Sequence, residues 1–128
     1  MVKEIRQNME IVLESISDAC SKAGRSPDEV TLMAVSKNHP AAIVAEALEV
    51  GLCNFGENRV QEAVEKKQAV VGSAFWELIG NLQTNKARLA AEHFDRIQSV
   101  DRLKLINALD RHCGELGRAR LPILLQVN

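Results

Sequence analysis

Three short polar segments of this chain carry residue types that could do chemistry. The first is Ser36-Lys37-Asn38, which directly follows the apolar run Leu32–Val35. An amine at the end of a buried strand is partly desolvated, and desolvation favours the neutral form, whose lone pair can attack a carbonyl carbon. The segment therefore predicts Schiff-base chemistry on Lys37. The alternative is a lysine that extends from the strand end into solvent.

The other two segments offer polar groups with two interpretations each. Asn58 could hydrogen-bond a polar ring substituent, or it could cap the next helix, because Gln61 stands three residues further on as in a capping box. The turn from Gln83 to Lys86 could hold an anion on its backbone N–H groups, or Thr84 could simply cap the helix that follows. The sequence leaves both questions open.

The composition excludes several classes of function. Lys and Arg number 16 against 17 Asp and Glu, whereas a protein that binds nucleic-acid phosphates needs a surplus of positive charge. Aromatic residues make up 3% of the chain and Tyr is absent, so we expect no base-stacking surface. The glycine-rich dinucleotide motif, the phosphate loop and the G-x-S-x-G nucleophile motif do not occur.

The cysteines and the N-terminus predict the cellular setting. Three cysteines without C-x-x-C spacing do not suggest a disulfide framework, and the scattered cysteines and histidines predict no metal site. The N-terminal segment mixes both charge signs and has no signal-peptide core, and the longest apolar runs are too short to cross a bilayer. We therefore expect a cytoplasmic protein without membrane contact.

The elements that must position these residues follow from apolar spacing and turn residues. Helices are predicted over 2–22, 41–50, 58–71, 84–93 and 102–115, the last capped by Asp101. Strands are predicted over 30–35, 52–55, 74–79, 96–100 and 122–127, the first of them buried on both faces.

This alternation predicts an α/β fold, with about five parallel strands, crossover helices and one extra N-terminal helix. A doubly wound sheet and part of a barrel both remain open, since a full eight-stranded barrel needs about 200 residues or more. In either fold, ligands bind beyond the carboxyl ends of the strands, where Lys37 and Asn58 both stand.

Five segments, taken in order, carry a family resemblance. They are AVSKNHP (34–40), NFGENRVQE (54–62), LIGNLQTNK (78–86), SVDR (99–102) and LLQVN (124–128). Together they strongly resemble the YggS/PROSC family of pyridoxal phosphate homeostasis proteins. The resemblance implies the fold of the alanine racemase N-terminal domain, a TIM-like (β/α)8 barrel that holds pyridoxal 5′-phosphate (PLP). It implies that Lys37 forms the Schiff base with PLP and that Asn58 lines the cofactor site.

This chain departs from the family pattern in two ways. Family members often have His after the Trp of the third strand, whereas this chain has Glu77 after Trp76. Family members also continue through a second half, which carries the segments that hold the cofactor phosphate. We therefore expect residues 1–128 to form a single, incomplete barrel domain that binds PLP weakly, because three missing charge-assisted hydrogen bonds would cost on the order of 5 kcal/mol. We also expect a truncated gene product, since the predicted strand at the C-terminus lacks a covering helix.

The resemblance implies a PLP-binding protein of cofactor homeostasis that does not turn over a substrate. Possible partners are PLP-dependent apo-enzymes that receive the cofactor, and a second copy of the chain that pairs with its exposed strand edges. One alternative is an amino-acid racemase-like PLP enzyme, which would need a second acid/base residue. The other is a fragment with little cofactor binding.

Overall fold

The N-terminal helix ends where the sequence places a glycine. The computed structural model describes residues 2–128, and its first helix, α1, covers Val2–Ala23. Gly24 follows with a φ of 69°, a left-handed conformation that glycine adopts without steric cost. The turn predicted at Ser26 is a short 3₁₀ helix, η1 (Pro27–Glu29), in which the Ser26 and Glu29 side chains form a capping box.

Strands and helices then alternate as predicted. They are β1 (Met33–Val35), α2 (Ala41–Glu49), β2 (Asn54–Glu57), α3 (Val60–Ala69), β3 (Phe75–Leu78), η2 (Thr84–Lys86), α4 (Ala87–His93), β4 (Arg96–Val100), α5 (Leu103–Leu116) and β5 (Ile123–Leu125). Several predicted boundaries differ from the observed ones by up to three residues, and two of them serve as examples. β2 extends two residues further, because Gly56 and Glu57 continue the ladder with β3. The N-cap of α5 is Arg102 rather than Asp101.

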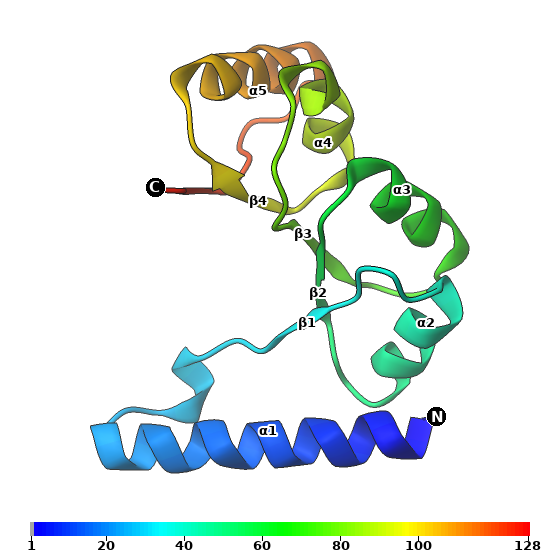
Figure 1. Cartoon of the computed structure of the whole chain (residues 1–128), viewed down its shortest axis with the longest axis vertical. Coiled ribbons are helices and arrows are strands. Elements are labelled where there is room, and N and C mark those ends of the chain that lie inside the picture. The colour runs from blue at the N-terminus through cyan, green and yellow to red at the C-terminus, as the bar shows by residue number, and fades with distance from the viewer. Residues whose placement is uncertain (1) are drawn as a thin grey trace.

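The strand order decides between the two folds that the sequence left open. All five strands are parallel and lie in chain order, β1-β2-β3-β4-β5. A doubly wound sheet contains a point where the strand order reverses, and this sheet has none over residues 2–128. Figure 1 shows α2, α3, α4 and α5 along one side of a curved sheet, with α1 next to α2 at the β1 end. This is the arrangement of successive units of a (β/α) barrel.

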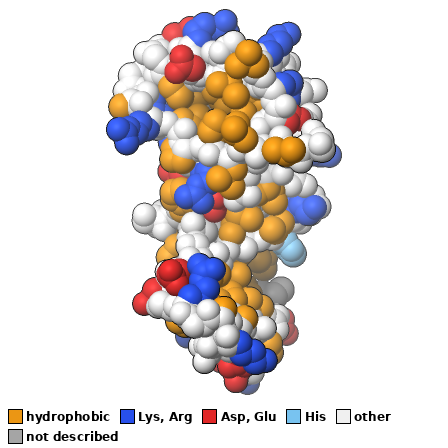
Figure 2. Space-filling view, turned by 90° about the vertical axis from the view of Figure 1, so that its left-hand side faces the viewer, with side chains coloured by type: hydrophobic (Ala, Val, Ile, Leu, Met, Phe, Trp, Pro, Cys, Tyr) orange, Lys and Arg blue, Asp and Glu red, His pale blue; other side chains and the backbone are white. Residues whose placement is uncertain are grey.

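The hydrophobic core lies between the sheet and helices α2 to α5. Its largest fully buried apolar side chains include Phe55, Leu78, Phe94, Ile97 and Leu105. Since side chains alternate along a strand, the intervening residues face the other side of the sheet. Figure 2, which views the molecule from the left of Figure 1, shows apolar side chains gathered on that side.

The first strand is an edge strand, which corrects the prediction that it is buried on both faces. β1 pairs only with β2, and its last residue, Val35, is 46% exposed. The apolar run that suggested full burial continues to Val30, which is also exposed and lies outside the strand. At the opposite edge β5 pairs only with β4, and Leu125 is exposed.

Candidate functional site

The register of the sheet brings Lys37 and Asn58 to the same edge. Val35 of β1 pairs with Gly56 of β2. Lys37 lies two positions after Val35, and Asn58 lies two positions after Gly56. The backbone N–H of Ser36 donates to the carbonyl of Gly56 at 3.0 Å, so the two chains stay together beyond the end of β1. The parallel ladder therefore places the Lys37 amine and the Asn58 amide at the carboxyl ends of neighbouring strands.

Lys37 lies on a tight, exposed turn. In the structure of residues 2–128 its amine is therefore not desolvated as we expected. Ser36 is buried, whereas Lys37 and Asn38 are exposed. The N–H of His39 donates to the carbonyl of Ser36 at 3.1 Å and closes the turn. The geometry leaves the amine accessible to a ligand.

Asn58 is held in place by a close approach of two backbones. A Cβ atom built on Gly80, beyond the end of β3, would lie 2.3 Å from the Asn58 carbonyl oxygen and 2.8 Å from its Cα. Only a glycine fits this contact. The N-cap of α3 is Arg59, so the predicted capping role of Asn58 is wrong. The half-buried Asn58 side chain makes no hydrogen bond to another residue between 2 and 128, so its amide is available to a ligand.

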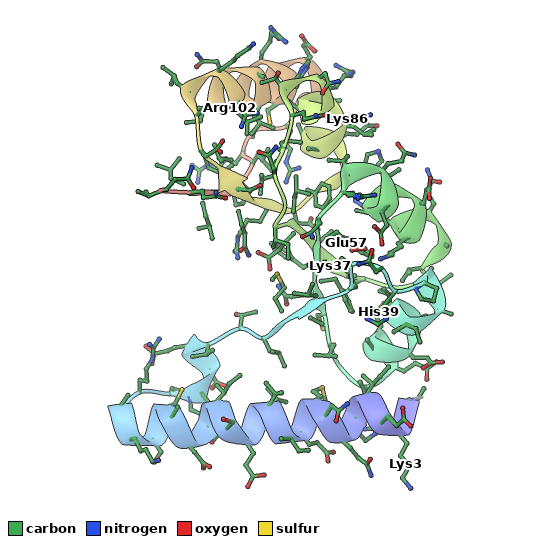
Figure 3. All side chains as sticks on the ribbon, viewed as in Figure 1. Lys3, Lys37, His39, Glu57, Lys86 and Arg102 are labelled. Carbon is green, nitrogen blue, oxygen red and sulfur yellow. The ribbon has the colours of Figure 1, made fainter. Side chains whose placement is uncertain are left out.

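The buried side chain of Lys66, on helix α3, contacts the ends of both β1 and β2. The Lys66 side chain on α3 is 7% exposed, and its Nζ donates to the Ser36 carbonyl at 2.6 Å. The same Nζ forms ion pairs with Glu57, at the end of β2, and with Glu62 of α3, the latter at 2.8 Å. Figure 3 shows Lys37 and Glu57 close together where β1 and β2 end. One ammonium group thus ties α3 to both segments of the candidate site.

The two carboxylates of this cluster differ in their electrostatics. Burial raises the pKa of Glu57, although its hydrogen bond with Lys66 opposes that shift. Its second oxygen, Oε2, is buried and has no hydrogen-bond partner within the described part of the chain. Hydrogen bonds from Lys66 and from the Asn38 backbone N–H lower the pKa of Glu62. Glu62 is therefore the carboxylate whose ionised form stabilises this region.

Acidification is expected to weaken this cluster through Glu62. Because its pKa is lowered in the folded state, the unfolded chain takes up this proton first as the pH falls. The stability that Glu62 contributes is present above its ordinary pKa of 4.5 and is lost as the pH falls through the lowered value. Urea unfolding from about pH 6 to about pH 3 should therefore show a steeper loss of stability in the wild type than in Glu62→Gln. Parallel losses in the two proteins would contradict this assignment.

The polar turn after β3 differs from its predicted form. Thr84 is the first residue of the short 3₁₀ helix η2 and not the cap of an α-helix, since α4 begins at Ala87. The preceding loop is anchored by Arg102, whose Nη2 donates to the Leu82 carbonyl at 2.6 Å. Figure 3 places Lys86 and Arg102 near α4 and α5, away from Lys37.

Glu77, the residue that departs from the family pattern, faces away from the helices. Trp76 and Leu78 on either side of it pack in the core, so alternation directs Glu77 to the other face of the sheet. It is 2% exposed, and its Oε1 accepts hydrogen bonds from Gln98 at 2.8 Å and from Arg96 at 3.1 Å. Its charge is therefore paired within the sheet.

Residues 2–128 contain neither a cluster suited to a metal ion nor a helix suited to spanning a membrane. No group of three or more His, Cys, Asp or Glu side chains in this range is arranged to hold a metal ion. No helix in the same range has the length and apolar character needed to cross a membrane.

Sequence reasoning selected Lys37 and Asn58 as candidates, an assignment that stays a prediction, and it missed the cluster of Glu57, Glu62 and Lys66 beside them. The pair Glu62 and Lys66 has the i, i+4 spacing of an ordinary surface ion pair, and nothing in that spacing indicates burial. The one available signal was Glu57, an acidic residue that lies two positions after Phe55, where the predicted second strand ends.

Comparisons with known proteins agree with this geometry. The family model described as "Alanine racemase, N-terminal domain" matches residues 6–128. The pyridoxal phosphate homeostasis protein of Escherichia coli K12 is 44% identical over 132 residues, which cover 99% of this chain and 56% of that protein. The chain thus spans about half the length of the curated relatives it matches.

Solved structures give the same result. PipY of Synechococcus elongatus PCC7942, determined with PLP bound, is 49% identical with a TM-score of 0.75, covering 88% of this chain and 54% of PipY. A crystal structure described as an unknown protein from Bifidobacterium adolescentis matches with a TM-score of 0.83 at 24% identity, over 95% of this chain and 60% of that one, and shows the fold alone. The predicted fold class and the resemblance to pyridoxal phosphate homeostasis proteins are confirmed, and this chain belongs to the alanine racemase N-terminal domain family.

Proposed function

We propose that this chain carries the lysine-bearing part of a PLP-binding protein of cofactor homeostasis, with Lys37 as the covalent anchor. The observation that carries the proposal is the exposed Lys37 amine beside Asn58 at the carboxyl edge of a parallel sheet. Relatives named pyridoxal phosphate homeostasis proteins, and PipY with PLP bound, support it.

The residues present fit the aldehyde end of this cofactor. When bound, PLP supplies an aldehyde that condenses reversibly with a primary amine. The Lys37 amine would attack the carbonyl carbon, and water would leave as the carbon–nitrogen double bond forms. The free Asn58 amide would orient the ring through a hydrogen bond to a polar substituent. Because the neighbouring carboxylates already pair with Lys66, they do not compete for the Lys37 amine.

We propose that this protein carries the cofactor and does not catalyse a reaction on it. Racemase chemistry needs a second acid/base group on the opposite face of the cofactor, and no Tyr within residues 1–128 supplies it. Relatives named pyridoxal phosphate homeostasis proteins support the carrier role. We further propose that the protein transfers PLP to apo-enzymes and that it self-associates through the free edges of β1 and β5. Three free cysteines support a reducing, cytoplasmic setting for this role.

The test is a PLP titration of the purified chain, followed by visible absorbance. We expect a weak but saturable band from the lysine adduct in the wild type, and its loss in Lys37→Ala. Lys86→Ala is the matched control, because Lys86 is also exposed but lies in η2, away from the Lys37 turn. Sedimentation of the same samples at several concentrations measures self-association, and adding an apo-enzyme measures transfer. A folded wild-type chain without a saturable band would contradict the proposal.

A further inference from the structure

The turn that carries Lys37 has a conformation that needs support. Among residues 2–128, Asn38 is the one non-glycine residue with a positive φ, 66°. Asparagine tolerates this left-handed region better than most residues, but the conformation remains less favourable than the ordinary ones. Because Lys37 is exposed and immediately precedes Asn38, the direction in which its amine points depends on how firmly this turn is held.

Both neighbours of Lys37 are held by groups from other elements. On one side, the Ser36 carbonyl accepts from Lys66 Nζ at 2.6 Å, and the Ser36 N–H donates to Gly56 at 3.0 Å. On the other side, the Asn38 N–H donates to Glu62 Oε1 at 2.8 Å. Lys37 is thus the free side chain between two anchored peptide groups.

Glu62 connects the two anchors. The same oxygen, Oε1, accepts a hydrogen bond from the Asn38 N–H and forms an ion pair with the Lys66 ammonium, each at 2.8 Å. A carboxylate that accepts hydrogen bonds from a backbone N–H and an ammonium group makes stronger bonds than a neutral acceptor would. The Glu62 side chain is 27% exposed, so removing it does not open a large cavity in the core.

We propose that Glu62 is a positioning residue that fixes the left-handed turn at Asn38 and thereby directs the Lys37 amine toward the strand end of Asn58. Lys66 acts with it, holding the Ser36 carbonyl and the Glu62 carboxylate. The effect on cofactor binding rests on the proposed function of Lys37, whereas the anchoring of the turn does not.

The test measures each part separately on the full chain. For the anchor, hydrogen exchange of the Asn38 amide is followed by NMR, with the Ile97 amide in the core as the reference for global unfolding. For the positioning, PLP adducts are trapped with borohydride, and the ratio of Lys37 to Lys86 labelling is read by peptide mass spectrometry. Both lysines are exposed, so Lys86 serves as an internal standard.

Glu62→Ala is expected to accelerate Asn38 exchange, and to lower the labelling ratio, by about tenfold, the equivalent of one hydrogen bond to a charged group. Glu62→Gln retains an acceptor oxygen but not the charge, and it is expected to restore only part of both readings. Glu65→Ala removes the same charge from the same helix, where the Glu65 carboxylate accepts from Gln61 and makes no hydrogen bond to the turn, and it should change neither reading. Glu62→Asp keeps the charge but shortens the side chain, and it replaces Glu62→Ala if rapid Ile97 exchange shows that variant to be unfolded.

The outcomes separate the two proposals. Unchanged Asn38 exchange in a folded Glu62→Ala variant would overturn the anchor. Faster exchange with an unchanged labelling ratio would overturn the positioning role. A wild-type chain that forms no preferential Lys37 adduct would overturn the proposed function, while the exchange measurement would still decide whether Glu62 anchors the turn.

Discussion

Replacing Lys66 with methionine is expected to destabilise the chain by about 3–5 kcal/mol, the usual cost of removing one partner from a buried ion pair. The reason is the carboxylate left behind. Glu57 is fully buried, and the ammonium of Lys66 is its principal compensating charge. Methionine fills most of the lysine volume, so the loss is electrostatic rather than a cavity effect. Urea unfolding followed by circular dichroism measures it.

The adjacent residue supplies the matched control. Lys67→Met makes the same substitution one position along α3, where the side chain is exposed and donates only to the His93 carbonyl. We expect a change within about 0.5 kcal/mol there. The double variant Glu57→Leu/Lys66→Met should recover much of the loss, because no unpaired charge then remains buried. Equal effects of Lys66→Met and Lys67→Met would contradict the role assigned to the buried pair.

Replacing Gly80 with alanine is the second substitution with a large expected effect. The new Cβ would lie 2.3 Å from the carbonyl oxygen of Asn58, which is a backbone atom and cannot rotate away. The ends of β2 and β3 must therefore separate, at a cost of about 1–3 kcal/mol or more. Since Asn58 moves with its backbone, the PLP titration should also show weaker binding in this variant. Urea midpoints and the titration measure the two effects.

An identical substitution elsewhere should have the opposite sign. Gly114 lies within α5, and a Cβ built there meets no atom within 4 Å. Gly114→Ala should therefore stabilise the chain by up to about 1 kcal/mol through helix propensity. If Gly80→Ala proved as neutral as a surface substitution, the tight contact between Gly80 and Asn58 would be wrong.

The sequence predicts this fold well because the information for it is local. Alternating apolar runs and turn residues identify every strand and α-helix, and the rule that ligands bind at the carboxyl ends of strands places Lys37 and Asn58 among the candidates. The family resemblance is what singles these two residues out. Strand order is not local, so apolar spacing left a barrel and a doubly wound sheet both open. The family resemblance implied the barrel, and the structure confirms it.

The errors concern residues whose environment depends on distant contacts. Asparagine is a common N-cap residue, which suggested that Asn58 caps the next helix. In the structure the backbone of Asn58 lies against Gly80, and the helix begins after Arg59. A lysine on a helix is usually exposed, but the ends of β1 and β2 bury the side chain of Lys66. Lys37 follows an apolar run, but that run forms an edge strand, and the lysine is therefore exposed.

The chain-order arrangement of the strands also bears on how the protein forms during synthesis. Each strand pairs with the one made just before it, so pairing never has to wait for a distant segment of the chain. The Lys37 turn, Asn58, Gly80 and the Lys66 cluster all precede β4. A nascent chain that has emerged from the ribosome as far as Gly80 already contains every residue that we describe around Lys37, and this end of the site can assemble before the remaining strands are translated.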